Sequence, residues 1–150
     1  AAEKGHVAIL KLLLSRPDVD PGSKGRAHMT PLLFATNNGN EDDIVKILLG
    51  NDRAHPDFAD KTGRTPLSLS VDYGHKGIVK LLVENKTVDP DSKDSEGRTP
   101  LSWAAASGRL DAVALLLEDD RVDPDTTDNP SRTVLSWSAG SGHEEVVKLL

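Results

Sequence analysis

Apolar residues recur along the chain in short runs with a helical period, and polar stretches rich in Pro, Gly and Asp separate these runs. Runs of Ile, Val and Leu at this spacing occupy 44–49, 78–83 and 110–117. A matching run near the start predicts a helix over about 7–14. Shorter segments that open on Thr-Pro, at 65–73 and 99–107, predict another helix before the later runs. The pattern therefore predicts pairs of helices joined by turns.

Three residue types mark one repeating unit. The first marker is a threonine, usually followed by Pro, at Thr30, Thr65, Thr99 and Thr133. The second is a glycine, at Gly5, Gly39, Gly74, Gly108 and Gly142. The third is a proline, at Pro21, Pro56, Pro90 and Pro124. In all three series neighbouring members are 34 or 35 residues apart, which is typical of a solenoid of stacked repeats.

Each unit is read in the same way. Threonine supplies a capping oxygen, Pro takes the first helical position, and the glycine ends the first helix. A second helix follows, and a loop such as 88–97, rich in Pro, Asp, Ser and Gly, closes the unit. One unit is a residue longer than the others between Gly39 and Pro56, and we expect the insertion in 50–53, after the second helix.

The segments 63–68 (Gly-Arg-Thr-Pro-Leu-Ser) and 97–105 (Gly-Arg-Thr-Pro-Leu-Ser-Trp-Ala-Ala) resemble the ankyrin repeat family, as do Gly74-His75, Gly142-His143 and the Val-x-x-Leu-Leu pattern of the second helices. The resemblance covers essentially the whole chain. It implies an all-α, ankyrin-type solenoid of stacked helix-turn-helix repeats with loop or β-turn fingers and a period of about 34 residues. Ser replaces the family's usual His after Thr-Pro-Leu, and Val-Asp-Pro-Asp replaces its usual loop ending. In both respects the chain resembles ankyrin arrays of filamentous-fungal proteins.

The markers divide the chain, which we expect to be one domain over 1–150, into successive units. These are a partial repeat at 1–20, full repeats at 21–55, 56–89 and 90–123, and a truncated repeat at 124–150. The chain begins and ends inside a repeat, and neither end has the polar capping repeat that a solenoid needs. We therefore expect it to be a piece of a longer array.

Composition and charge narrow the range of partners. The net charge is −6 and there is no cluster of Lys and Arg, so a nucleic-acid partner is not expected. No apolar run approaches the roughly 20 residues that span a bilayer, so no membrane partner is expected either. The chain has no Cys, which excludes disulfides and thiolate chemistry and fits a reducing compartment. We expect an intracellular protein, cytoplasmic or nuclear.

Catalytic motifs are absent: the sequence holds no phosphate-binding loop, no nucleophile elbow and no His-Glu-x-x-His. His6, His75 and His143 each follow a turn glycine in a different repeat, so we interpret them as helix-entry residues rather than metal ligands. His28 and His55 lie in loops without ligand neighbours. We expect no enzyme activity, no cofactor and no metal.

Three series of side chains recur at one register. Ser68, Ser102 and Ser136 are interpreted as bonding nearby backbone and tying one repeat to the next, a bond that Leu33 would remove in its own repeat. Phe34, Leu69, Trp103 and Trp137 are interpreted as core between helices and repeats, with an aromatic stripe for a ligand as the alternative. Asp60, Asp94 and Asp128 precede Arg64, Arg98 and Arg132 by four residues. These are interpreted as exposed pairs that order the loops, with a charged lip for a partner as the alternative.

The family resemblance implies that a partner binds the concave face and the loop tips. The matching residues are Arg26, Met29, Asn37, Asn38, Lys61, Thr62, Arg64, Asp72, Tyr73, Ser95, Glu96, Arg98, Ser107, Asn129, Arg132 and Ser141. Tyr73 and the arginines are the best anchors by residue type. We therefore expect a protein-protein interaction module, a scaffold or sensor segment, that is monomeric or associates weakly end to end. The alternative is a structural array that assembles through its uncapped ends.

Overall fold

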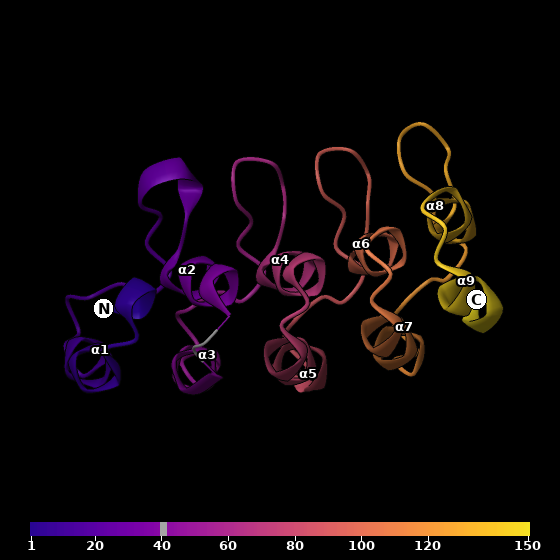
Figure 1. Cartoon of the computed structure of the whole chain (residues 1–150). Coiled ribbons are helices and arrows are strands. Elements are labelled where there is room, and N and C mark those ends of the chain that lie inside the picture. Colours follow the sequence, from indigo (N-terminus) through magenta and orange to yellow (C-terminus); the bar gives the residue numbers. More distant parts are fainter. Residues whose placement is uncertain (40–41) are drawn as a thin grey trace.

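The computed structural model describes residues 1–39 and 42–150. Its elements are η1 (Ala2–Lys4), α1 (Val7–Leu14), η2 (Arg26–His28), α2 (Pro31–Asn38), α3 (Asp42–Leu49), α4 (Pro66–Tyr73), α5 (Lys76–Glu84), α6 (Pro100–Ala106), α7 (Leu110–Leu117), α8 (Val134–Gly140) and α9 (Glu144–Leu149). The helices stack in two rows (Figure 1): an inner row of α2, α4, α6 and α8, and an outer row of α1, α3, α5, α7 and α9. Four loops project beyond the inner row as fingers. The all-α solenoid predicted from the repeat is confirmed.

Local sequence explains the short inner helices. In α2, α4, α6 and α8 the threonine before the helix accepts a hydrogen bond from the backbone N–H three residues later, as in Thr65 with Ser68 at 3.4 Å. Such a cap contributes about 1 kcal/mol. Gly74 ends α4 with a φ of 76°, a left-handed conformation that only glycine adopts without strain. The caps and the glycine stop predicted from the sequence are confirmed.

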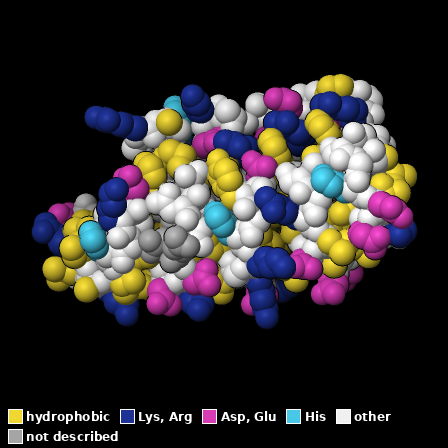
Figure 2. Space-filling model, in the orientation of Figure 1, with side chains coloured by type: hydrophobic (Ala, Val, Ile, Leu, Met, Phe, Trp, Pro, Cys, Tyr) yellow, Lys and Arg dark blue, Asp and Glu magenta, His cyan; other side chains and the backbone are white. Residues whose placement is uncertain are grey.

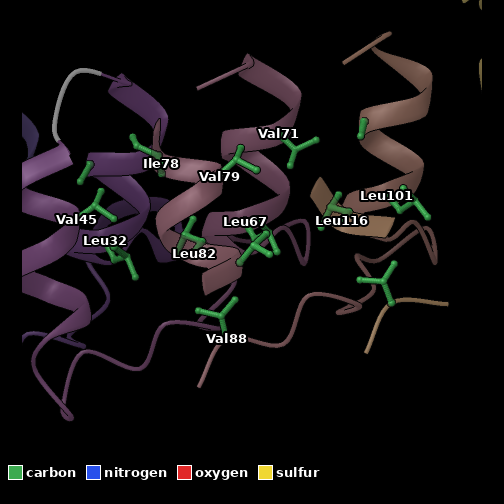
Figure 3. Close-up of a cluster of buried hydrophobic side chains, with 14 of the residues drawn as sticks. Leu32, Val45, Leu67, Val71, Ile78, Val79, Leu82, Val88, Leu101 and Leu116 are labelled. Carbon is green, nitrogen blue, oxygen red and sulfur yellow. The ribbon is translucent and has the colours of Figure 1, made fainter. Parts of the chain in front are cut away.

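The core runs continuously along the array between the two rows (Figure 3). Each repeat contributes the same kinds of residue, such as Leu67 and Val71 from the inner helix and Leu82 from the outer helix, all at most 1% exposed. Burying a side chain of this kind is worth roughly 1.5–3 kcal/mol. Because neighbouring repeats share this core, the position of each inner helix is fixed by the repeats on either side of it.

The prediction for the extra residue is wrong. Buried Leu48 lies six positions before buried Ala54, and Leu82 and Val88 show the same separation, so the loop after the outer helix has no insertion. Instead, buried Ile44 lies five residues after Gly39, whereas buried Ile78 lies four residues after Gly74. The extra residue therefore comes between Gly39 and Ile44 in the sequence.

The serine series does not tie repeats together, contrary to expectation. Ser68 Oγ donates to the Thr65 carbonyl at 3.0 Å, and Ser136 Oγ donates to the Thr133 carbonyl at 2.8 Å. Both bonds lie within the first turn of one helix, so Leu33 removes no contact between repeats. The interpretation that the hydroxyl bonds nearby backbone is confirmed for Ser68 and Ser136, whereas Ser102 Oγ lies 3.2 Å from the Thr99 side-chain oxygen.

Two contacts between repeats come instead from residues that directly follow a turn glycine. Arg109 donates to the Asp72 carbonyl at 3.1 Å, and His143 Nε2 lies 3.0 Å from the Ala106 carbonyl oxygen. Arg109 also covers Gly74, where an added Cβ would lie 2.8 Å from its guanidinium carbon. The glycine is therefore required both for its φ and for this close approach. The histidine at this register is a helix-entry residue, as predicted from the sequence.

Candidate functional site

The base of the finger at 91–98, here the third finger, is held by one buried carboxylate. Asp94 is 1% exposed in its side chain and accepts hydrogen bonds from the backbone N–H groups of Glu96 and Arg98, both at 2.9 Å. The same carboxylate accepts from Arg98 Nε at 3.0 Å and from Trp103 Nε1 at 3.2 Å. A carboxylate with several donors is well satisfied although it is buried. This network fixes the finger to the inner helix α6.

The finger at 125–132, here the fourth finger, repeats the buried carboxylate and its arginine, but Pro130 takes the place of Glu96 and supplies no backbone N–H. Asp128 is 0% exposed in its side chain and accepts from the Arg132 backbone at 2.8 Å and from Arg132 Nε at 2.9 Å. Burial acts to raise the pKa of Asp128, but the hydrogen bonds from Arg132 outweigh it and lower the pKa. The description of these pairs as exposed is therefore wrong, because the loop folds back and encloses the carboxylate. Their interpretation as elements that order the loop agrees with this geometry.

The recurring aromatic residues serve both the core and the fingers. Trp103 and Trp137 pack partly buried against the core. Their other faces carry arginines of the fingers, with the Arg98 guanidinium 4.0 Å from the Trp103 ring centre and Arg132 3.8 Å from that of Trp137. Such stacking contributes roughly 0.5–2 kcal/mol, depending on how well it is desolvated. Trp103 and Trp137 therefore pack against the core and also support the arginines of their fingers.

Contacts between two neighbouring repeats join several predicted binding residues into one cluster. Arg64 Nη1 lies 3.6 Å from Asp72 Oδ2, and Ser107 Oγ donates to Asp72 Oδ1 at 3.3 Å. The Arg64 guanidinium also lies 5.8 Å from the centre of the Trp103 ring. Arg64, Asp72, Trp103 and Ser107 therefore form a continuous surface across α4 and α6, which we call the inner cluster.

The finger tips beside the inner cluster are open to solvent and bonded to one another. Lys61, Thr62, Ser95 and Glu96 are exposed. The Ser95 N–H donates to the Thr62 carbonyl at 3.0 Å, and in the next pair the Asn129 N–H donates to the Glu96 carbonyl at 2.9 Å. The tips therefore form one edge rather than separate loops.

The predicted binding residues fall into two groups by exposure. Tyr73 is 46% exposed at the end of α4, and Asn129, Arg132 and Ser141 are also exposed. By contrast the side chains of Arg64 and Arg98 are only 24% and 18% exposed and are engaged by carboxylates of their own fingers. Both arginines therefore support the fold before any partner contacts them.

The predicted binding residues nearest the start of the chain lie around the first finger, residues 22–29, which differs from the later fingers. Arg26, Asn37 and Asn38 are exposed and Met29 is partly covered. Asn38 Nδ2 donates to the Glu3 carbonyl at 2.8 Å, so this residue ties the inner row to η1. None of these residues reaches the inner cluster through a described hydrogen bond or ion pair.

Sequence reasoning left two kinds of residue out of the candidate surface. Trp103 and Trp137 were interpreted as core, with an aromatic stripe for a ligand as the alternative, and the aspartates of the Asp-Arg pairs were treated as exposed charges. The signal that could have found them is the fixed spacing of Asp, Arg and Trp, at +4 and +9, in the third and fourth fingers. Within residues 1–39 and 42–150, no three His, Cys, Asp or Glu side chains lie close enough to hold a metal ion.

Comparison with known proteins identifies the family. A family model that describes ankyrin repeats in three copies matches residues 1–94 and 86–150. The chain belongs to the ankyrin repeat family. Ankyrin repeats are generally protein-protein interaction modules and are typically not enzymes. In the part of the chain that the structure describes, no helix is long and apolar enough to cross a membrane.

One curated ankyrin repeat protein is similar in sequence to this chain. The ankyrin repeat protein YahD of Escherichia coli (strain K12) is 38% identical over 82 residues, which are 52% of this chain and 40% of the relative. The chain thus spans less than half the length of the relative it matches.

Proposed function

We propose that the chain binds a partner protein with the inner cluster and the edge formed by the finger tips. The observation that carries this proposal is the joining of Arg64, Asp72, Ser107 and Trp103 into one surface across two repeats. A binding surface needs anchors whose side chains are already held in place, because less conformational entropy is then lost on association. The stacked Trp and Arg residues meet that requirement.

The exposed tips supply specificity in this proposal. Lys61, Ser95 and Asn129 occupy the same position in three successive fingers and differ from one another, whereas the residues that hold the fingers repeat. Tyr73 adds an exposed aromatic side chain, a type enriched among residues that dominate binding energy. A scaffold or sensor segment that recognises one protein through these positions fits both the regular framework and the variable tips.

Site-specific photo-crosslinking tests the proposal. A photoreactive phenylalanine analogue at Tyr73 should crosslink the same protein as one at Lys61, and an analogue at Glu118 on the outer helix row should not. The double variant Tyr73→Ala with Lys61→Glu should weaken capture of that protein about tenfold or more, since each change removes an exposed anchor rather than a support of the fold. Equal crosslinking from Glu118, or unchanged capture by the double variant, contradicts this assignment.

A further inference from the structure

A groove on the outer row lies apart from the finger tips and borders the inner cluster at Arg109, which donates to the Asp72 carbonyl. It runs between α5 and α7, has a volume of about 450 Å³, and is lined by Gly74, Lys76, Val79, Lys80, Gly108, Arg109, Leu110, Asp111, Ala112 and Leu115. Binding pockets commonly have volumes of about 300–1,000 Å³. On this side of the molecule, hydrophobic side chains reach the surface beside Lys and Arg (Figure 2).

The groove exists because α7 departs from its neighbours at two positions. Ala112 stands where α5 has Ile78, which is 1% exposed, so the volume of a larger side chain is missing between the helices. Leu110 stands where α5 has Lys76, and it is 39% exposed. The first change opens the groove, and the second adds an aliphatic side chain to its wall. The floor, made of Val79, Ala112 and Leu115, is aliphatic as well.

The rim of the groove is mainly basic, although the chain as a whole carries a net charge of −6. Lys76, Lys80 and Arg109 face one acid, Asp111, which pairs with Lys76 across the groove. Lys80 lies 3.8 Å from Glu84 in its own helix. Arg109 donates to the Asp72 carbonyl and forms no salt bridge within the described residues. Exposed pairs such as Lys76 with Asp111 contribute little and can exchange partners readily.

We propose that the groove between α5 and α7 binds an amphipathic helix of a partner protein, with aliphatic side chains on the floor and Asp or Glu residues against the rim. The volume exceeds what one aliphatic side chain fills, and its position between two helices suits the successive anchors of a helix laid into a groove. The basic rim selects an acidic partner and orients it. Ala112 on the floor and Lys80 on the rim belong to no part of the surface of the proposed function, so variants at these two residues test the groove independently.

Methyl NMR with a synthetic helix tests the proposal. The probe is an Ala-based peptide of roughly 16 residues, a length at which a helix becomes marginally stable in water, with Leu at i, i+4 and i+7 and flanking Glu. We expect saturable shifts of the Leu110, Ala112 and Leu115 methyl signals. A matched peptide with Lys in place of Glu should bind about tenfold more weakly, because it meets a rim of like charge.

Two variants of the intact chain separate the groove from the fold. Ala112→Ile restores the side chain found at this register in α5 and should abolish the shifts while leaving the thermal unfolding midpoint at least as high. Lys80→Glu reverses a rim charge at an exposed position. It should weaken binding of the Glu peptide and should not weaken binding of the Lys peptide. Absence of shifts at about 1 mM peptide, a millimolar limit that marks very weak binding, overturns the proposal. Equal binding by Ala112→Ile, or shifts confined to the fingers, also overturns it. Crosslinking from Tyr73 should be unaffected by either variant.

Discussion

The first and third fingers are closed by the same backbone hydrogen bond but have different means of support. In the first finger, residues 22–29, the Gly25 N–H donates to the Met29 carbonyl at 2.9 Å; in the third, the Asp94 N–H donates to the Arg98 carbonyl at 3.0 Å. Only the third finger adds a buried carboxylate and a stacked arginine, because Gly25 and Met29 replace that pair in the first. The backbone closes the loop in both cases, and the side chains decide how firmly it is held.

The two tips differ accordingly. The first finger has two consecutive non-glycine residues with positive φ, Ala27 at 56° and His28 at 61°, and both are exposed. At the register of His28 the third finger has Gly97, with a φ of 80°. A non-glycine residue in this conformation costs roughly 1–2 kcal/mol. The first finger is therefore the strained and less supported member of the pair.

The largest expected effect comes from removing the support of the third finger. Asp94→Ala leaves the Arg98 guanidinium, the Trp103 Nε1 and two backbone N–H groups without their acceptor. We expect a loss of about 3–5 kcal/mol in the free energy of unfolding, as when a buried pair loses one member. Urea unfolding followed by circular dichroism measures it. Glu96→Ala removes the exposed partner of the same arginine and should cost less than about 1 kcal/mol. If both variants lose the same small amount, the buried carboxylate is not the support of this finger.

A smaller effect is expected from exchanging residues at the tips. His28→Gly relieves the positive φ and should raise the free energy of unfolding by about 0.5–1 kcal/mol, after allowance for the greater freedom of glycine in the unfolded chain. Gly97→Ala should lower it by more than about 1 kcal/mol, because its Cβ would also lie 2.6 Å from Asn129 Oδ1. The same unfolding experiment compares them. A gain for Gly97→Ala would show that the tip conformation is not what distinguishes the fingers.

The smallest effect concerns a cost that the third finger carries and the first finger does not. Burial raises the pKa of Asp91, and the charge of Asp123 adds to the rise; the first finger has Gly22 at this register. A carboxyl whose folded pKa is raised stabilises the fold while protonated, and this contribution is lost as pH rises through the folded pKa. Asp91→Asn should therefore raise the thermal midpoint at neutral pH and leave it unchanged near pH 3, where the unfolded carboxyl is also protonated.

Asp119 provides the opposite case as a control. Its hydrogen bond with Arg121 lowers the pKa of Asp119 to about 2. This contribution to stability is present above the ordinary value of 3.8 and is lost as pH falls towards 2. Asp119→Asn should thus lower the thermal midpoint at neutral pH and lose its effect in acid. Melting curves of both variants at several pH values check the two signs, and a shift of the same sign for both would contradict the assignment.

Much of the fold could be predicted from the sequence, because its signals are local and repeated. The helix expected over 7–14 is α1, Val7–Leu14, and the threonine caps are found in each inner helix. The position of the extra residue could not be obtained in this way. The distance from Gly39 to Pro56 spans a whole helix and does not reveal on which side of it a residue was added; only the buried register of Leu48 decides this.

The candidate surfaces depend on information that spacing does not contain. Asp94 and Arg98 have the separation of an exposed helical pair, but they lie in a loop whose backbone N–H groups converge on the carboxylate. The groove beside Ala112 is a missing volume, and alanine is unremarkable in a helix until it is compared with the larger Ile78 at the same register. Both features come from packing between elements rather than from any single segment.

The contact between Arg109 and the turn at Gly74 also bears on how such an array grows. The donor, Arg109, lies at the entry of a second helix. The acceptor, the Asp72 carbonyl, lies at the turn of the preceding repeat, which Arg109 covers. A tandem duplication of one unit therefore supplies a matched pair of surfaces in a single genetic event, with no new interface to be selected. Repeats can then be added without a new kind of interface, and the close approach of the next repeat constrains the covered glycine in addition to its φ.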